Sequence, residues 1–209
     1  YKGFINDTVA NHSYTWHDAI HQKSPLAADS LNPCGYNLKE PCDDNNHGTH
    51  TMGTMVGSDT SNLIGVAPGA QWIACRNMER GNGQLSTYLE CFEWFLAPTD
   101  LDGNNPDPTK APHVINNSWY CSPEEGCNPG NWDALQIAVK NLKAAGVVVV
   151  VSAGNSGPGC ETINAPPAHF EPSFSVGASM INDTIANFSS RGPVSIDSSY
   201  RVKPDVVAP

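Results

Sequence analysis

The sequence has no long apolar run and little positive charge. Its longest aliphatic stretch is the five valines at residues 147–151, whereas a membrane-spanning helix needs about 18 or more apolar residues. Eleven lysines and arginines stand against 21 aspartates and glutamates, so the net charge is -10. Because nucleic acids and anionic membranes are themselves negative, this balance disfavours both as partners. We therefore expect a soluble protein that binds neither nucleic acid nor membrane.

No Cys-x-x-Cys motif occurs among the seven cysteines, which argues against a zinc ribbon or a thioredoxin-type redox site. Two close pairs, Cys34 with Cys42 and Cys121 with Cys127, lie in loop-forming sequence and are hypothetical disulfides of a secreted protein. Cys75 lies in an apolar run, and we expect it to be a buried free thiol.

Five N-glycosylation sequons also agree with an extracellular protein. They begin at Asn6, Asn11, Asn116, Asn182 and Asn187. Asn116 follows an apolar run, so we expect it to be too buried for modification.

Apolar periodicity predicts an α/β protein. Helical spacing indicates helices from about residue 47, over 85–96 and over 132–145, and short apolar runs indicate strands at 71–75, 113–116 and 147–151. The all-valine run is typical of a parallel strand covered on both faces. We predict a three-layer, doubly wound, mostly parallel sheet with helices on both faces, and an irregular surface region over residues 1–46.

Ligands of such sheets bind beyond the carboxyl ends of the strands, which here means residues 116–120 and 152–157. Asn155 brings a side-chain amide to the second segment, a donor suited to an oxyanion. A nucleophile elbow has the motif G-x-S-x-G. Ser156 does not match this motif, because Gly157 follows the serine directly and Pro158 occupies the fifth position. A plain glycine turn that closes the strand is the other interpretation.

The segment DDNNHGTHTMG, residues 43–53, places two acids beside two histidines, His47 and His50. A metal site with Asp43 is one interpretation, although the spacing differs from the zinc-peptidase motif. A general base is another, since imidazole titrates near neutral pH and can accept a proton from a hydroxyl nucleophile. The third is a plain helix N-terminus, with its caps at Asp44, Asn45 and Asn46.

Five segments in order along the chain resemble the subtilisin-like serine proteases (subtilases), most closely their secreted, bacillopeptidase F-like members. These segments are HGTHTMGT at 47–54, VINNSW at 114–119, SAGNSG at 152–157, FSSRGP at 188–193 and KPDVVAP at 203–209. The resemblance implies a subtilisin-like fold that is incomplete at both ends. It also implies that residues 1–209 are one partial catalytic domain, beginning after the catalytic Asp segment and ending before the catalytic Ser segment.

The resemblance also implies roles for single residues. His47 becomes the general base of an Asp/His/Ser triad, Asn155 the oxyanion donor and His50 a structural residue. A peptide substrate would be held as an added strand, with Gly154 at the floor of the specificity pocket. The two substrate-binding edges would be Gly81, Asn82 and Gly83, and Ser118, Trp119 and Tyr120. Tyr120 replaces the glycine usual in the family and would narrow the cleft.

Neither the D-[ST]-G motif of the catalytic aspartate nor the G-T-S-[MA] motif of the nucleophile occurs in the 209 residues, and residue 1 is tyrosine. We interpret the sequence as a fragment that is inactive by itself. The implied whole is a secreted, monomeric endopeptidase that cleaves polypeptides through an acyl-enzyme; a pro-region is left open.

The chemistry so implied requires no cofactor, and no metal ligand is assigned. DLDG at 100–103 suggests structural calcium, but its spacing departs from the EF-hand loop, so calcium stays unassigned. Two alternatives remain: an inactive module that binds extended peptides along the same two edges, and the metal site at His47 and His50.

Overall fold

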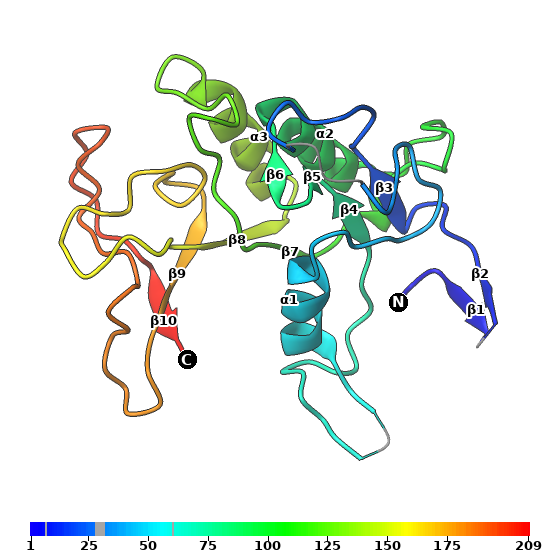
Figure 1. Ribbon diagram of the computed structural model, residues 1–209, viewed down its shortest axis with the longest axis horizontal. Helices are drawn as coiled ribbons and strands as arrows, with labels where there is room; N and C mark the ends of the chain where they lie inside the picture. The colour runs from blue at the N-terminus through cyan, green and yellow to red at the C-terminus, as the bar shows by residue number, and fades with distance from the viewer. Residues whose placement is uncertain (7, 28–31, 60) are drawn as a thin grey trace. The chain divides into compact units, whose positions relative to one another are not determined.

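The computed structural model of the chain describes residues 1–6, 8–27, 32–59 and 61–209 (Figure 1). Its contacts divide the chain into two units, Tyr1–Pro112 and His113–Pro209.

The first unit combines short strands with two longer helices. Its elements are β1 (Phe4–Asn6), β2 (Val9–Ala10), β3 (Trp16–Asp18), α1 (His47–Val56), β4 (Ala74–Arg76), β5 (Met78–Glu79), β6 (Asn82–Gly83), α2 (Leu85–Leu96) and a 3₁₀ turn, η1 (Pro108–Lys110). β3 pairs in parallel with β4, whereas β1–β2 and β5–β6 are antiparallel. The helices predicted from residue 47 and over 85–96 are confirmed, and the strand expected at 71–75 begins three residues later.

The region before residue 47 is not merely an irregular surface, and that prediction is wrong. β3 carries the buried side chains of Trp16 and Asp18, and Ile20 directly after it is also buried. Parallel pairing with β4 brings this segment into the core. The pairing partner lies more than fifty residues further along the chain, so local composition did not reveal it.

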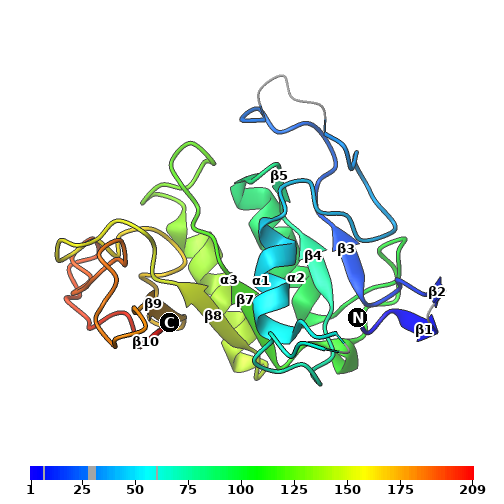
Figure 2. The ribbon, with the colours of Figure 1, turned by 60° about the horizontal axis from the view of Figure 1, so that its bottom comes forward.

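The second unit is a parallel sheet with the strand order β10-β9-β8-β7. Its strands are β7 (Val114–Asn117), β8 (Val148–Ser152), β9 (Phe174–Ala178) and β10 (Val206–Ala208), and α3 (Trp132–Ala144) connects β7 to β8. α3 packs beside these strands (Figure 2). It buries Leu135, Val139 and Leu142, and it ends before Gly146, whose φ of +87° suits glycine.

The valine strand is parallel, as predicted, but its two faces differ. Val149 and Val151 are 2% and 1% exposed, whereas Val148 is 50% exposed. The exposed fractions alternate along β8 because successive side chains of a strand point to opposite faces of the sheet.

Candidate functional site

His47 is the first residue of α1, and its side chain is exposed. The preceding residue, Asn46, has a left-handed φ of 68° and makes no side-chain cap bond to the helix. His50, in the same first turn, is exposed as well. The helix therefore presents both imidazoles of the motif on the surface of the first unit.

The first turn of α1 is capped by Asp43. One carboxylate oxygen accepts the Thr49 N–H at 2.7 Å and the Thr49 hydroxyl at 2.6 Å, and the other accepts the N–H groups of Asn45 and Asn46. Partial burial raises the pKa of Asp43, but these hydrogen bonds outweigh burial and leave that pKa below its ordinary value. The plain helix N-terminus interpretation placed the caps at Asp44, Asn45 and Asn46. Asn46 is the N-cap residue but makes no side-chain cap bond, and the side-chain bonds to the first turn come from Asp43 instead.

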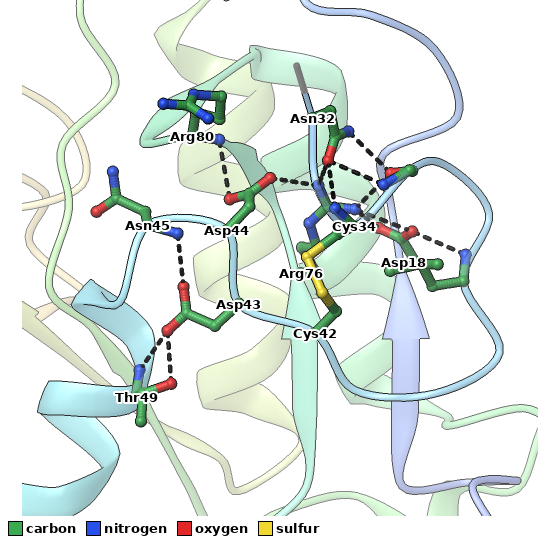
Figure 3. The surroundings of a disulfide bond; sticks show 12 residues. Asp18, Asn32, Cys34, Cys42, Asp43, Asp44, Asn45, Thr49, Arg76 and Arg80 are labelled. Atoms are coloured by element: carbon green, nitrogen blue, oxygen red, sulfur yellow. Dashed lines mark hydrogen bonds and ion pairs between the residues drawn. A yellow bond between two sulfur atoms is a disulfide. The ribbon is translucent and has the colours of Figure 1, made fainter. Parts of the chain in front are cut away.

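Asp44 points in the opposite direction, into the unit (Figure 3). Its carboxylate contacts the Arg76 guanidinium at 2.5 Å and accepts the Arg80 N–H at 2.9 Å. Arg76 also pairs with Asp18 at 3.3 Å, and all three side chains are at most 5% exposed. An ion network of this kind is stable only when each buried charge has partners, and here two carboxylates share one guanidinium.

The predicted substrate edge Gly81, Asn82 and Gly83 lies in the β5–β6 hairpin. Glu79 pairs with Asn82 across a two-residue turn, where Arg80 and Gly81 have φ values of 51° and 83°. Two successive left-handed residues define the hairpin turn that matches strand twist. At Gly83 a Cβ would lie 2.2 Å from the Tyr88 hydroxyl oxygen, so glycine is required there by packing.

The metal interpretation of the histidine motif gains no support. Among the residues that the structure describes, no group of three His, Cys, Asp or Glu side chains is arranged to hold a metal ion. In the 100–103 loop, Asp100 accepts the N–H groups of residues 102 and 104, and Asp102 pairs with Lys39 at 2.6 Å. Calcium there stays unassigned.

The second unit brings together the other predicted site residues. Ser118 follows β7 and Gly154 follows β8, and these two parallel strands are direct neighbours with Asn117 opposite Val151. Trp119 is half-buried, whereas Tyr120 and Asn155 are exposed. Since the carboxyl ends of parallel strands meet at one edge of a sheet, both segments leave the sheet at the edge where ligands are expected.

Gly154 has a φ of +101°, and a Cβ there would lie 2.9 Å from the Ser190 hydroxyl oxygen. That hydroxyl accepts the Ser156 N–H at 3.0 Å, and the Ser190 N–H donates to the Gly154 carbonyl at 3.0 Å. The turn that carries Asn155 is thus held from both sides by Ser190. Its glycine is a geometric requirement, which the sequence indicated only as a run of small residues.

All seven cysteines are described, and six form disulfides. Cys34–Cys42 and Cys121–Cys127 pair as hypothesised. The expectation of a free Cys75 is wrong, because Cys75 on β4 is bonded to Cys91 on α2; the free cysteine is Cys160, which is exposed. Burial of Cys75 was inferred from its apolar run, but a buried partner on another element was not visible there.

The sequon asparagines are exposed at all five positions. This corrects the expectation for Asn116. Along β7 the buried residues are Ile115 and Asn117, and strand alternation turns Asn116 to the other face. Its amide donates to the Ser118 hydroxyl at 2.9 Å, within the same sequon. The peptide bond between Pro166 and Pro167 is cis.

Comparison with known proteins decides the family. A profile of the Subtilase family matches residues 5–209. The chain belongs to the subtilase family. Bacillopeptidase F of Bacillus subtilis (strain 168) is 38% identical over 216 residues, which is 100% of this chain and 13% of that protein. Serine protease AprX of the same organism is 35% identical over 181 residues, 81% of this chain and 39% of that protein.

A solved structure gives the same result for the subtilase fold. A cold adapted subtilisin-like serine proteinase has a TM-score of 0.55 and 26% identity over 82% of this chain and 51% of that chain. The α/β fold is therefore subtilisin-like. The chain spans only a minor part of the two curated relatives.

Sequence reasoning missed the Asp18–Arg76–Asp44 network of this subtilase chain. Asp18 also accepts the N–H of Leu38 at 2.8 Å, so the network reaches the loop between the two cysteines of Cys34–Cys42. The available signal was an acid in the apolar stretch TWHDAI and an arginine after WIAC. Charges within apolar runs are buried in pairs more often than alone.

Proposed function

We propose that this chain is part of a secreted serine endopeptidase that hydrolyses polypeptides through an acyl-enzyme. The observation that carries the proposal is the Subtilase family match over residues 5–209, together with His47 exposed at the start of α1. None of the described helices is long and apolar enough to cross a membrane. The disulfides support an oxidising compartment.

In this proposal His47 accepts the proton of a serine hydroxyl as that oxygen attacks the scissile carbonyl, and then donates the proton to the leaving amine. The serine and the aspartate that orients His47 come from outside the 209 residues. Asn155 donates its side-chain N–H to the developing oxyanion. The 81–83 hairpin and residues 118–120 each serve as an edge to which the substrate backbone adds as a strand. Gly154 forms the floor of the specificity pocket, and no cofactor takes part.

The test uses the full-length protein and a fluorophosphonate probe, which labels an activated serine. His47→Ala should lower the rate of labelling by about 100-fold or more, the usual contribution of a general base. His50→Ala is the matched control, because it removes an equally exposed imidazole three residues away. It should be labelled at nearly the wild-type rate.

Undiminished labelling of His47→Ala would refute its role as the base. Equal loss in both variants would point to damage of α1 and would also count against the assignment. A wild-type protein that the probe does not label would refute the endopeptidase itself and favour the inactive peptide-binding module.

A further inference from the structure

Three consecutive residues shortly before α1 contact α1, β4 and the β5–β6 hairpin turn of the first unit. Asp43 caps α1 through Thr49. Asp44 holds Arg76 at the end of β4 and the N–H of Arg80 in the hairpin turn. The amide nitrogen of Asn45 lies 2.9 Å from the position that a Cβ on Gly81 would take. Figure 3 shows the first two side chains leaving the backbone in opposite directions.

The hairpin turn that Asp44 contacts holds a residue with a Cβ, Arg80, in the left-handed region. Arg80 has a φ of 51°, a conformation that residues with a Cβ rarely adopt. Its N–H is fixed by a carboxylate that is itself 4% exposed and ion-paired. A charge-assisted hydrogen bond from a backbone N–H is among the stronger kinds. Asp44 therefore fixes the turn from which the edge Gly81, Asn82 and Gly83 continues.

The other end of this segment is also fixed. Cys42, next to Asp43, is bonded to Cys34. Asn32, on the far side of the same loop, accepts from Arg76 through its side-chain oxygen at 3.3 Å. Asn32 and Asp44 therefore contact the same guanidinium, that of Arg76. Because the segment 42–45 is anchored at each residue, α1 and the hairpin are tied together through four consecutive residues.

From this arrangement we propose that Asp44 is a positioning residue for substrate binding: it sets the hairpin edge 81–83 for an extended peptide, while Asp43 sets His47 for the chemistry. The inference rests on the proposed function. It assigns substrate binding to Asp44 and the chemical step to the adjacent Asp43. A substrate that does not reach the hairpin edge should be insensitive to Asp44, whereas every substrate should depend on Asp43.

The experiment compares an extended peptide with a single-residue ester in the full-length enzyme. Active enzyme is counted by fluorophosphonate titration, so loss of folded protein does not enter the rates. Asp44→Ala should lower kcat/KM for the peptide about tenfold relative to the ester, mainly through KM, because the hairpin turn loses the charge-assisted hydrogen bond from the Arg80 N–H. Asp44→Asn keeps an oxygen for the Arg80 N–H and should restore part of that ratio.

Asp43→Ala is the matched control. It should lower kcat for both substrates by the same factor and leave the peptide-to-ester ratio at the wild-type value. An unchanged ratio in Asp44→Ala, or an equal fall of the ratio in Asp43→Ala, would overturn the inference. If Asp44→Ala does not fold, a wild-type ratio in Asp44→Asn overturns it instead. If the wild-type protein shows neither labelling nor turnover, the proposed function is refuted and this inference is refuted with it. The other outcomes all require an active wild-type enzyme, so the two kinds of failure can be told apart.

Discussion

Asn155 and Ser156 are exposed neighbours in one turn. In the proposed function the side chain of Asn155 contributes to catalysis, whereas the hydroxyl of Ser156 does not. In the full-length enzyme, Asn155→Ala should slow turnover and leave KM for peptides nearly unchanged, because its N–H acts on the oxyanion of the transition state and not on the bound substrate. Steady-state kinetics with a peptide substrate measure kcat and KM separately.

Ser156→Ala is the control for this turn. It removes the hydroxyl that a nucleophile elbow would need, but it keeps the N–H that donates to Ser190. Full fluorophosphonate labelling is expected. Loss of labelling would revive Ser156 as the nucleophile, and an Asn155→Ala enzyme with normal kcat and raised KM would contradict the oxyanion role.

Single-residue predictions failed where the environment comes from a distant segment. Cys75 and Asn116 both follow apolar residues, and burial was inferred for both on that basis. The first has a disulfide partner sixteen residues away, and the second lies on the exposed face of its strand. The residues next to Cys75 and Asn116 in the sequence reveal neither the disulfide partner nor the exposed face of the strand. The segments that carry His47 and Asn155 were matched to the subtilase family because their motifs are contiguous, and the roles of both residues stay predictions.

At the scale of elements, the stability of the first turn of α1 should depend on pH through Asp43. The pKa of this carboxyl is lowered in the folded chain, so its stabilising effect is present above the pKa of the unfolded state. The effect is lost as pH falls through the folded pKa, below about pH 4. The Thr49 amide, which donates to Asp43, should therefore show an acid titration in its NMR chemical shift.

Asp43→Asn supplies the comparison for that titration. The single amide oxygen can still accept the bonds from Thr49 but does not titrate, so the Thr49 shift should be flat in this variant. A titration that persists in Asp43→Asn would assign the effect to another group and contradict the cap.

The helices were predictable, and so were the apolar strands β7 and β8, whereas β3, β9 and β10 were not. α2 and α3 follow from apolar residues at helical spacing, which is a local property. β3, β9 and β10 are three to five residues long and exist because a remote strand pairs with them. The ion network around Arg76 has the same origin, since it joins residues 18, 44 and 76.

For the whole molecule, the disulfides predict a definite thiol count. Under native, non-reducing conditions one cysteine, the exposed Cys160, should react with iodoacetamide. After unfolding and reduction, all seven should react. Mass spectrometry of the alkylated chain gives both numbers. Native modification at Cys75 or Cys91 would contradict the bond between β4 and α2, and Cys160→Ser should show no native modification.

The disulfides also have a simple order along the chain. Each joins a cysteine to the next one in sequence, across separations of 8, 16 and 6 residues. A chain that emerges N-terminus first from a translocation pore would therefore complete each bridge before the next pair appears. Cys160 follows the last pair and would meet no unpaired thiol among residues 1–159. Correct pairing of these six cysteines would therefore need no thiol–disulfide exchange.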